Sequence, residues 1–267
     1  MKYTVSFLFS LFYLTSSSQS ALEHYNTGIS KKDIQDYKGA ILEFNKSIEL
    51  DPKSRDAFFY LGYCKSELND FKGAIIDYGK AIYIDNRMVN AYYNRGHCKA
   101  KLKDFEGAIQ DFNKTVELDS KYSNAYLSKA VCRDSLADYV GAIQEINKYI
   151  EMNPNMMGYF NRAMYKHKLK DFRGAIQDYS KVLELDPNNF MAFFYRGNEK
   201  AWLEDIQGAI QDYSKSIEIA PDFSKAYFKR GIFRFEIGDT EGACLDFSKA
   251  GELGLSIAYS KIQQLCN

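Results

Sequence analysis

The sequence has no excess of either charge, because 35 Lys and Arg residues balance 35 Asp and Glu residues. A surface that binds nucleic acid needs a clustered basic excess, so we do not expect nucleic acid as a partner. The apolar run near the N-terminus, at residues 5–14 (VSFLFSLFYL), has only ten residues. At about 1.5 Å rise per residue, a helix of this length is too short to cross a bilayer.

Histidine is also scarce. The three histidines, His24, His97 and His167, lie far apart in the chain and in different sequence contexts. Their spacing suggests neither a zinc site nor a Cys-His nucleophile. The glycines recur periodically and do not form a phosphate-binding loop. We therefore expect no catalytic residues, no metal site and no cofactor, and we predict that the protein is not an enzyme.

What the sequence does contain is one short segment used seven times. A Gly-Ala pair recurs at successive intervals of 34, 34, 34, 33, 34 and 34 residues, from Gly39 and Ala40 to Gly242 and Ala243. A fixed period of this length indicates a repeat array in which each unit contacts only its neighbours. We expect seven repeats within residues 21–257, at about 21–54, 55–88, 89–122, 123–155, 156–189, 190–223 and 224–257.

Each repeat contains two helical patterns. In the third repeat, small and apolar residues recur at helical spacing over residues 91–102 and again over 108–118. An Asp precedes the second pattern in every repeat, where its side chain can cap the free amides of a helix. These residues are Asp36, Asp70, Asp104, Asp138, Asp171, Asp205 and Asp239. The expected fold is all-α, with stacked antiparallel helix pairs, and residues 258–267 are expected to form a capping helix over the last pair.

Large and small residues alternate in a fixed order within each unit. In the third repeat the order is Tyr92, Gly96, Ala108 and Phe112, and several units close on a Pro, as at Pro52. This 34-residue unit resembles the tetratricopeptide repeat, and the resemblance covers about residues 21–257. The resemblance implies a right-handed superhelical solenoid whose first helices line a concave groove. In the family that groove usually binds peptides or protein segments.

Basic residues replace two positions that are usually Leu and Tyr in the family. In the third repeat they are Arg95 and Lys99, which are four residues apart and share one helix face. The second helix carries an acid in every repeat, as at Asp111. We predict semi-buried ion pairs between the two helices of each repeat. The alternative is a solvated ladder in which each acid pairs with the Lys three residues later, worth a few tenths of a kcal/mol per pair.

The resemblance also places a set of candidate binding residues in the concave groove. The first members of this set are the residues that directly follow the core aromatic of each first helix. Further aromatic rings and Asn amides are expected beside them on the same helices. Aromatic rings alternating with Asn amides suit an extended peptide. The alternative is that the rings only pack on their neighbours and close the groove. The candidates are Tyr25, Phe59, Tyr63, Tyr93, Asn94, His97, Leu127, Phe160, Asn161, Met164, Phe194, Asn198 and Phe228.

One familiar ligand class of the family is not expected. Family members that clamp a C-terminal carboxylate use Lys and Asn on one first helix, Asn on the next, and Lys with Arg on the third. Lys225 and Lys229 could imitate the last pair, but Phe160, Met164 and Tyr195 stand where the other polar residues would be needed.

The cysteines fall into two groups. Cys64, Cys98 and Cys132 are 34 residues apart and occupy one position of three adjacent repeats, too far from one another for a disulfide, so we expect buried thiols. Cys244 and Cys266 lie in the last repeat and its extension. A disulfide between these two is expected, with two inert thiols as the alternative.

Residues 1–20 have the pattern of a signal peptide. Lys2 is followed by the apolar run and then by small polar residues suited to cleavage after Ser20. We therefore expect an exported protein, periplasmic or extracellular, with no stable membrane insertion after cleavage. The expected function is a non-enzymatic scaffold that binds a protein or an extended peptide. The alternative is a structural protein of the cell envelope that self-associates or organises a complex through its convex face or its ends.

Overall fold

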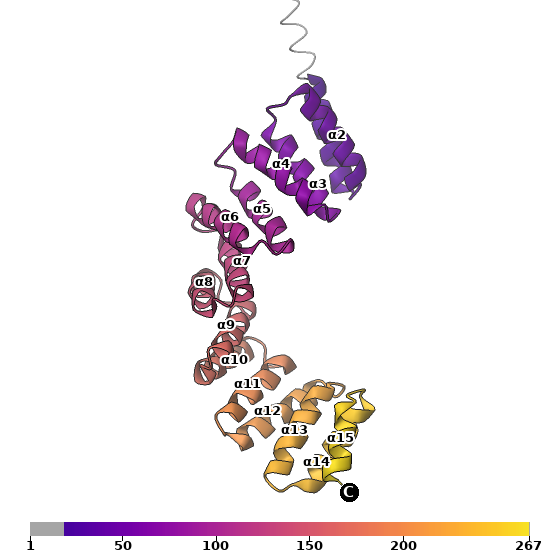
Figure 1. The fold of residues 1–267 in the computed structure, drawn as a ribbon, viewed down its shortest axis with the longest axis vertical. Helices are drawn as coiled ribbons and strands as arrows, with labels where there is room; N and C mark the ends of the chain where they lie inside the picture. The colour runs from indigo at the N-terminus through magenta and orange to yellow at the C-terminus, as the bar shows by residue number, and fades with distance from the viewer. Residues whose placement is uncertain (1–18, 267) are drawn as a thin grey trace, which may run out of the picture. The chain divides into compact units, whose positions relative to one another are not determined.

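The computed structural model describes residues 19–266, which form helices joined by short turns and contain no strand (Figure 1). The predicted signal peptide lies almost wholly outside these residues. The first described helix spans residues 19–33. It is followed by α2 (Tyr37–Leu50), α3 (Arg55–Glu67), α4 (Phe71–Ile84), α5 (Val89–Lys101), α6 (Phe105–Leu118), α7 (Ser123–Ser135), α8 (Tyr139–Met152), α9 (Met156–Lys168), α10 (Phe172–Leu185), α11 (Phe190–Trp202), α12 (Ile206–Ile219), α13 (Ser224–Glu236), α14 (Thr240–Glu252) and α15 (Ile257–Leu265).

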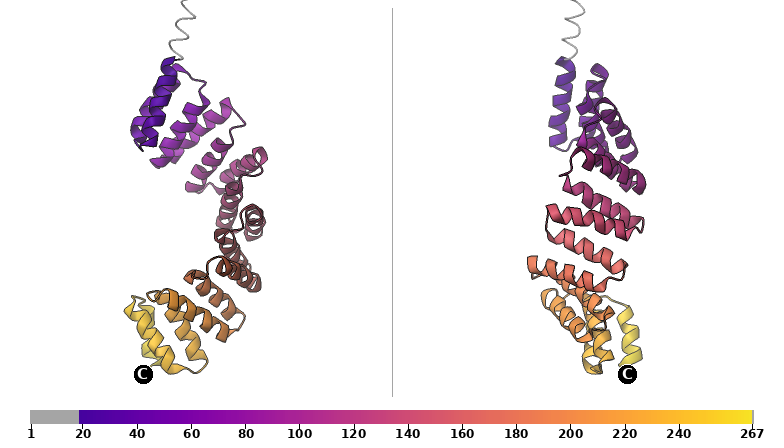
Figure 2. Two further views of the ribbon diagram at one scale, coloured as in Figure 1. Left: turned by 180° about the vertical axis from the view of Figure 1, so that it is seen from behind. Right: turned by 90° about the vertical axis from the view of Figure 1, so that its left-hand side faces the viewer.

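The helices form two compact units, one ending at Leu136 and the other beginning at Ala137. In the first unit each helix from α2 to α7 packs on the next one along the chain. The second unit has the same arrangement from α8 to α15, as Figure 2 shows from two further sides. The expectation of an all-α array of helix pairs is therefore confirmed. The boundary between the units falls within the expected fourth repeat, between α7 and α8.

The Asp residues before the second helices cap them as predicted. In the third repeat, Asp104 Oδ1 accepts a hydrogen bond of 3.0 Å from the Gly107 backbone amide. The preceding residue, Lys103, has a φ of 64°, and this left-handed conformation reverses the chain between α5 and α6. The same cap is made by Asp36, Asp70, Asp138, Asp171, Asp205 and Asp239.

The close approach within a helix pair involves an aromatic ring as well as the backbone. Phe112 of α6 is fully buried, and a Cβ added to Gly96 of α5 would lie 2.8 Å from its ring. In the second repeat, a Cβ on Gly62 would lie 3.2 Å from the backbone oxygen of Ala74. The glycine column therefore accommodates the second helix and the aromatic side chain that this helix carries.

The predicted ion pairs between the two helices of a repeat are confirmed. Nε and Nη2 of Arg95 donate to the two carboxylate oxygens of Asp111 at 2.9 and 2.6 Å, and Lys99 Nζ lies 2.8 Å from the same carboxylate. Asp111 is only 3% exposed, and the Arg95 guanidinium lies over the Tyr92 ring. Three further repeats share this cluster, with Asp178 between Arg162 and Lys166, Asp212 between Arg196 and Lys200, and Asp246 between Arg230 and Arg234.

The buried acid of the first repeat has different partners, because Thr27 stands where the third, fifth, sixth and seventh repeats have Arg. Glu43 of α2 instead binds Lys31 at 3.1 Å and His24 Nδ1 at 2.7 Å. The hydrogen bond from His24, followed by that from Lys31, lowers the pKa of Glu43 to about 2.

At the other end, α15 packs on α14, and a disulfide joins Cys244 of α14 to Cys266. Ala258 of α15 is fully buried. The other three cysteines, Cys64, Cys98 and Cys132, are buried free thiols. In the part of the chain that is described, no helix is both long and apolar enough to span a membrane.

Removing the carboxylate of one cluster should strongly destabilise the protein. We expect Asp111→Ala to lower the free energy of unfolding by about 3–5 kcal/mol, because it leaves Arg95 and Lys99 without their buried counter-charge. Urea unfolding followed by circular dichroism measures the loss. The matched control in the same helix is Glu117→Ala, which removes an exposed pair with Lys114 and should cost less than about 0.5 kcal/mol. Equal losses in the two variants would contradict the role assigned to the buried cluster.

Breaking the disulfide should loosen the last repeat. The bond closes a sequence separation of 22 residues, so Cys266→Ser is expected to cost about 2–4 kcal/mol of stability. Reductant should lower the stability of the wild type to that of the variant and leave the variant unchanged. Intact-mass measurement of the oxidised wild type should show a chain two hydrogens lighter than its reduced form. A wild type insensitive to reductant would show that the bond does not hold α15 in place.

Candidate functional site

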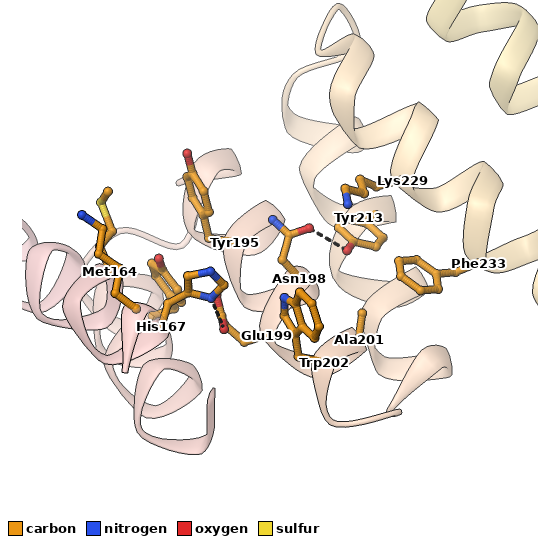
Figure 3. Close-up of a pocket in the computed structure, with 12 residues that line it drawn as sticks. Met164, His167, Tyr195, Asn198, Glu199, Ala201, Trp202, Tyr213, Lys229 and Phe233 are labelled. Atoms are coloured by element: carbon orange, nitrogen blue, oxygen red, sulfur yellow. Dashed lines mark hydrogen bonds and ion pairs between the residues drawn. The ribbon is translucent and has the colours of Figure 1, made fainter. Parts of the chain in front are cut away.

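One concave site lies in the second unit, along the first helices of its last three pairs. It is a cavity of about 510 Å³ formed mainly by α9, α11 and α13, with two tyrosines contributed by α10 and α12 (Figure 3). Its lining consists of Met164, His167, Lys168, Tyr179, Tyr195, Asn198, Glu199, Ala201, Trp202, Tyr213, Lys229 and Phe233. Five of these twelve residues are Tyr, Trp or Phe, and the lining exposes more apolar than polar surface.

Stacked rings make the walls of this cavity. Tyr195 stacks on Tyr179, with ring centroids 5.9 Å apart, and Phe233 stacks on Tyr213 at 6.0 Å. Trp202, in the last turn of α11, stacks on Phe172 and remains 64% exposed. A tryptophan ring held flat against another ring, with much of its surface in water, provides apolar area that a ligand can cover at little cost in side-chain entropy.

A buried carboxylate lies beneath the cavity. Glu199 occupies the position in its repeat that Cys98 occupies in the third, and it is only 1% exposed. Its Oε2 lies 2.9 Å from Nδ1 of His167, on the neighbouring first helix. Burial raises the pKa of Glu199, and the hydrogen bond from His167 opposes this shift only in part.

Asn198 is oriented by a second hydrogen bond. The Tyr213 hydroxyl donates to Asn198 Oδ1 at 2.9 Å. Burial raises the pKa of Tyr213, so this phenol keeps the proton that it donates. With Oδ1 engaged, the Asn198 amide nitrogen points away from Tyr213, toward the side of the cavity where Tyr195 lies (Figure 3).

The first unit has a smaller site with related chemistry. A cavity of about 330 Å³ is lined by Lys32, Phe59, Tyr60, Tyr63, Asn90, Asn94 and Tyr122. The ammonium group of Lys32 lies over the rings of Tyr60 and Tyr63, at 5.3 and 5.9 Å from their centroids. Tyrosine rings, at least one Asn amide and at least one lysine therefore line both cavities.

The structure brings five of the predicted groove residues to these cavities. They are Phe59, Tyr63 and Asn94 in the first unit and Met164 and Asn198 in the second.

The other predicted rings pack mainly against their own repeat. Tyr93 lies 5.7 Å from Phe112, and Phe160 lies 5.3 Å from Tyr179, measured between ring centroids. The ring of Phe194 packs on Tyr213 and is only 7% exposed, which leaves little of it for a ligand. Tyr25 and Phe228 pack in the same way on Phe44 and Phe247.

The remaining predicted residues line neither cavity. Leu127 and Asn161 are half-buried. His97 packs edge-on against Tyr93, and its Nε2 lies 3.2 Å from the Ser128 hydroxyl.

Several cavity residues were not among the predicted site residues. Tyr60, Tyr195 and Lys229 occupy the same repeat position as Asn94, which was predicted. Their shared position could therefore have identified them as site residues from the sequence. Trp202 and His167 lie later in their helices, where the repeat pattern indicates no role. No cluster of three or more His, Cys, Asp or Glu side chains among residues 19–266 is placed to hold a metal ion.

Sequence models of the tetratricopeptide repeat match residues 56–87, 89–122 and 157–189. No curated protein matches the sequence. Among solved structures, the C-terminal part of a TPR repeat-containing protein from Cytophaga hutchinsonii aligns with a TM-score of 0.78 at 20% identity, over 86% of this chain and 95% of that one. A tetratricopeptide repeat protein from Parabacteroides merdae aligns with a TM-score of 0.65 at 18% identity, over 93% and 100% of the two chains. YrrB, described as a TPR protein with an unusual peptide-binding site, gives a TM-score of 0.61 at 23% identity, over 68% and 95%. The chain therefore has a TPR-like all-α solenoid fold.

The buried carboxylate of Glu199 should make stability depend on pH. The pKa of Glu199 in the folded protein lies above the ordinary value of 4.5. Ionising this group therefore lowers the free energy of unfolding as pH rises above that value. Glu199→Gln removes this cost and keeps an oxygen that can accept from His167. We expect the variant to melt a few degrees higher than the wild type at pH 8 and at the same temperature near pH 4, as measured by differential scanning calorimetry.

The control for this prediction is Glu184→Gln, which changes an exposed Glu paired with Lys181. It should leave the melting temperature unchanged at both pH values. A Glu199→Gln variant that is less stable than the wild type at pH 8 would show that the ion pair with His167 outweighs the desolvation of the carboxylate.

Proposed function

We propose that this chain is an exported, non-enzymatic scaffold that binds a partner protein by holding an extended segment of it against the first helices. The observation that carries the proposal is the 510 Å³ cavity, where exposed aromatic surface and a few oriented polar groups converge on three successive first helices. Its size and apolar lining are typical of sites that bind ligands. The description of YrrB as having a peptide-binding site supports the same type of ligand.

An extended peptide suits both cavities chemically. Rings such as Trp202 and Tyr60 offer apolar area to the ligand's side chains, while Asn198 and Asn94 can pair with its backbone amides.

Two observations support export. The N-terminal pattern of charge, apolar run and small residues is that of a signal peptide, and the disulfide between Cys244 and Cys266 is a bond that persists in oxidising compartments. Cleavage after Ser20 would keep the hydrogen bond that the Ser47 hydroxyl donates to the Ala21 carbonyl oxygen at 2.8 Å. The first residue of the mature chain would therefore still contact α2.

A second candidate function, assembly through the second helices of the end repeats, has one observation in its favour. Leu42, Ile76 and Leu245 share one repeat position and are 62%, 59% and 66% exposed. Inner repeats have Gln at this position, as at Gln110, Gln144, Gln177 and Gln211. Apolar side chains are therefore exposed on the first two repeats and the last, where a further copy or a partner could cover them.

The binding proposal can be tested with an mRNA-displayed library of random decapeptides flanked on both sides by Gly-Ser linkers. Immobilised residues 21–267 should enrich a family of peptides. Affinity measured by fluorescence anisotropy should then fall at least tenfold on Trp202→Ala or Tyr60→Ala, because each variant removes a ring from a cavity. Tyr83→Ala is the matched control, since Tyr83 lies on the second helix α4, is 92% exposed and lines neither cavity.

Enrichment that neither cavity variant weakens would overturn the proposal, as would the absence of any enriched family. A native mass spectrum that shows oligomers of the unliganded wild type, together with failure of the selection, would favour the assembly function.

A further inference from the structure

Building on the proposed function, we infer that the cavity of the second unit recognises an acidic side chain within the partner's chain, together with a large apolar side chain next to it. In this arrangement His167, Asn198 and Lys229 bind the carboxylate, and the rings of Trp202 and Phe233 receive the apolar side chain.

The polar groups that remain available in the cavity are donors. Asn198 uses Oδ1 for the Tyr213 hydroxyl, and its amide nitrogen has no acceptor among residues 19–266. Lys229 lines the cavity and makes no ion pair with any residue of the described chain. A ligand that binds these two donors must provide acceptor atoms. A carboxylate does so with charge-assisted hydrogen bonds, which are stronger than those of a neutral acceptor.

The buried Glu199 orients His167 so that this side chain, too, can donate to a ligand's oxygen. Glu199 faces Nδ1 of His167, so Nε2 is the nitrogen left on the cavity side of the ring (Figure 3). The hydrogen bond to Glu199 fixes the orientation of the ring, and an imidazole nitrogen that carries a proton donates to an acceptor in the cavity. Glu199 is 1% exposed and is the one acidic side chain among the lining residues, whereas Lys168 and Lys229 are both basic. The accessible part of the cavity therefore favours an anion.

The surrounding rings require an apolar neighbour for that anion. Trp202 stacks on Phe172, and Phe233 stacks on Tyr213, so each ring is held with one face against protein. A cavity of about 510 Å³ is larger than one carboxylate side chain needs. An acidic residue flanked by Phe, Leu or Met would fill this space and cover the exposed indole of Trp202.

The lining favours an acidic residue inside the partner's peptide over a carboxylate at that peptide's C-terminus. Met164 and Tyr195 stand where the clamp for a chain terminus would have polar groups, and they present a thioether and a ring. The wall beside the donors is thus apolar, which suits a peptide that continues on both sides of its acidic residue.

The composition of the peptides selected above tests this inference. The linkers at both ends of the library exclude free terminal carboxylates from the random region. We expect wild-type protein to enrich Asp or Glu beside an aromatic or aliphatic residue. Changing that acid to its amide in the best peptide should weaken binding at least tenfold.

A double-mutant cycle then assigns the contact. Lys229→Glu should weaken binding of the acidic peptide at least tenfold and abolish the difference between the acid and amide peptides. Lys225→Glu is the matched control, because it makes the same charge change on an exposed residue of α13 that does not line the cavity, and it should keep the full acid preference. A shortened peptide that ends on the acidic residue should bind no more tightly with a free carboxyl terminus than as the amide.

The outcomes separate this inference from the proposed function. If the enriched peptides depend on Trp202 but show no acid preference, or if Lys229→Glu leaves the acid preference intact, the inference is wrong and peptide binding stands. Tighter binding of the free carboxyl terminus would also overturn it, in favour of a terminal clamp. If no enriched peptide depends on Trp202 or Tyr60, the proposed function itself fails.

Discussion

In four of the repeats, a buried carboxylate of the second helix lies between two cationic side chains of the first helix. Asp111, the example in the third repeat, is 3% exposed and lies between a guanidinium and an ammonium group of the facing helix. Burying such a group is costly unless charge and hydrogen bonds compensate it, and here the paired helix supplies both. The requirement ties the two helices in register, because a shift of one residue would separate the acid from both cations. The aromatic and glycine positions beside the cluster then pack in a single arrangement.

The fold could be predicted because the same constraints occur in every repeat. One Asp before a helix is a weak signal, but seven at a constant period, each followed by Gly three residues later, indicate seven caps. The ion pairs could be predicted for the same reason, since Lys99 and Asp111 have basic and acidic counterparts in every repeat and Arg95 has basic counterparts from the fourth repeat onward. The packing of the glycine column was predicted less completely. Backbone proximity was expected, and the structure adds the ring of Phe112 against Gly96.

The candidate site was predicted only in part, because its residues are the ones that do not repeat. Asn198 and Met164 were found through their position beside an aromatic column, whereas Trp202 and the pair of His167 and Glu199 each occur once. Periodicity carries no information about such residues, and their proximity depends on how three first helices stack. The aromatic column itself was ambiguous in the sequence. A ring such as Phe194 can face a groove or its own repeat, and only the positions of the neighbouring side chains distinguish the two.

The buried ion clusters have a consequence for the response of the protein to ionic strength. Mobile salt ions screen charges in contact with solvent over about 10 Å at 0.1 M, but they act much less on pairs from which water is excluded. The carboxylates of Asp178 and Asp212 are shielded in this way, whereas the cavity donors proposed to bind the ligand are only half-buried. The acidic ligand proposed for the cavity would therefore dissociate at a salt concentration well below one that loosens the helices, and the protein would release it while remaining folded.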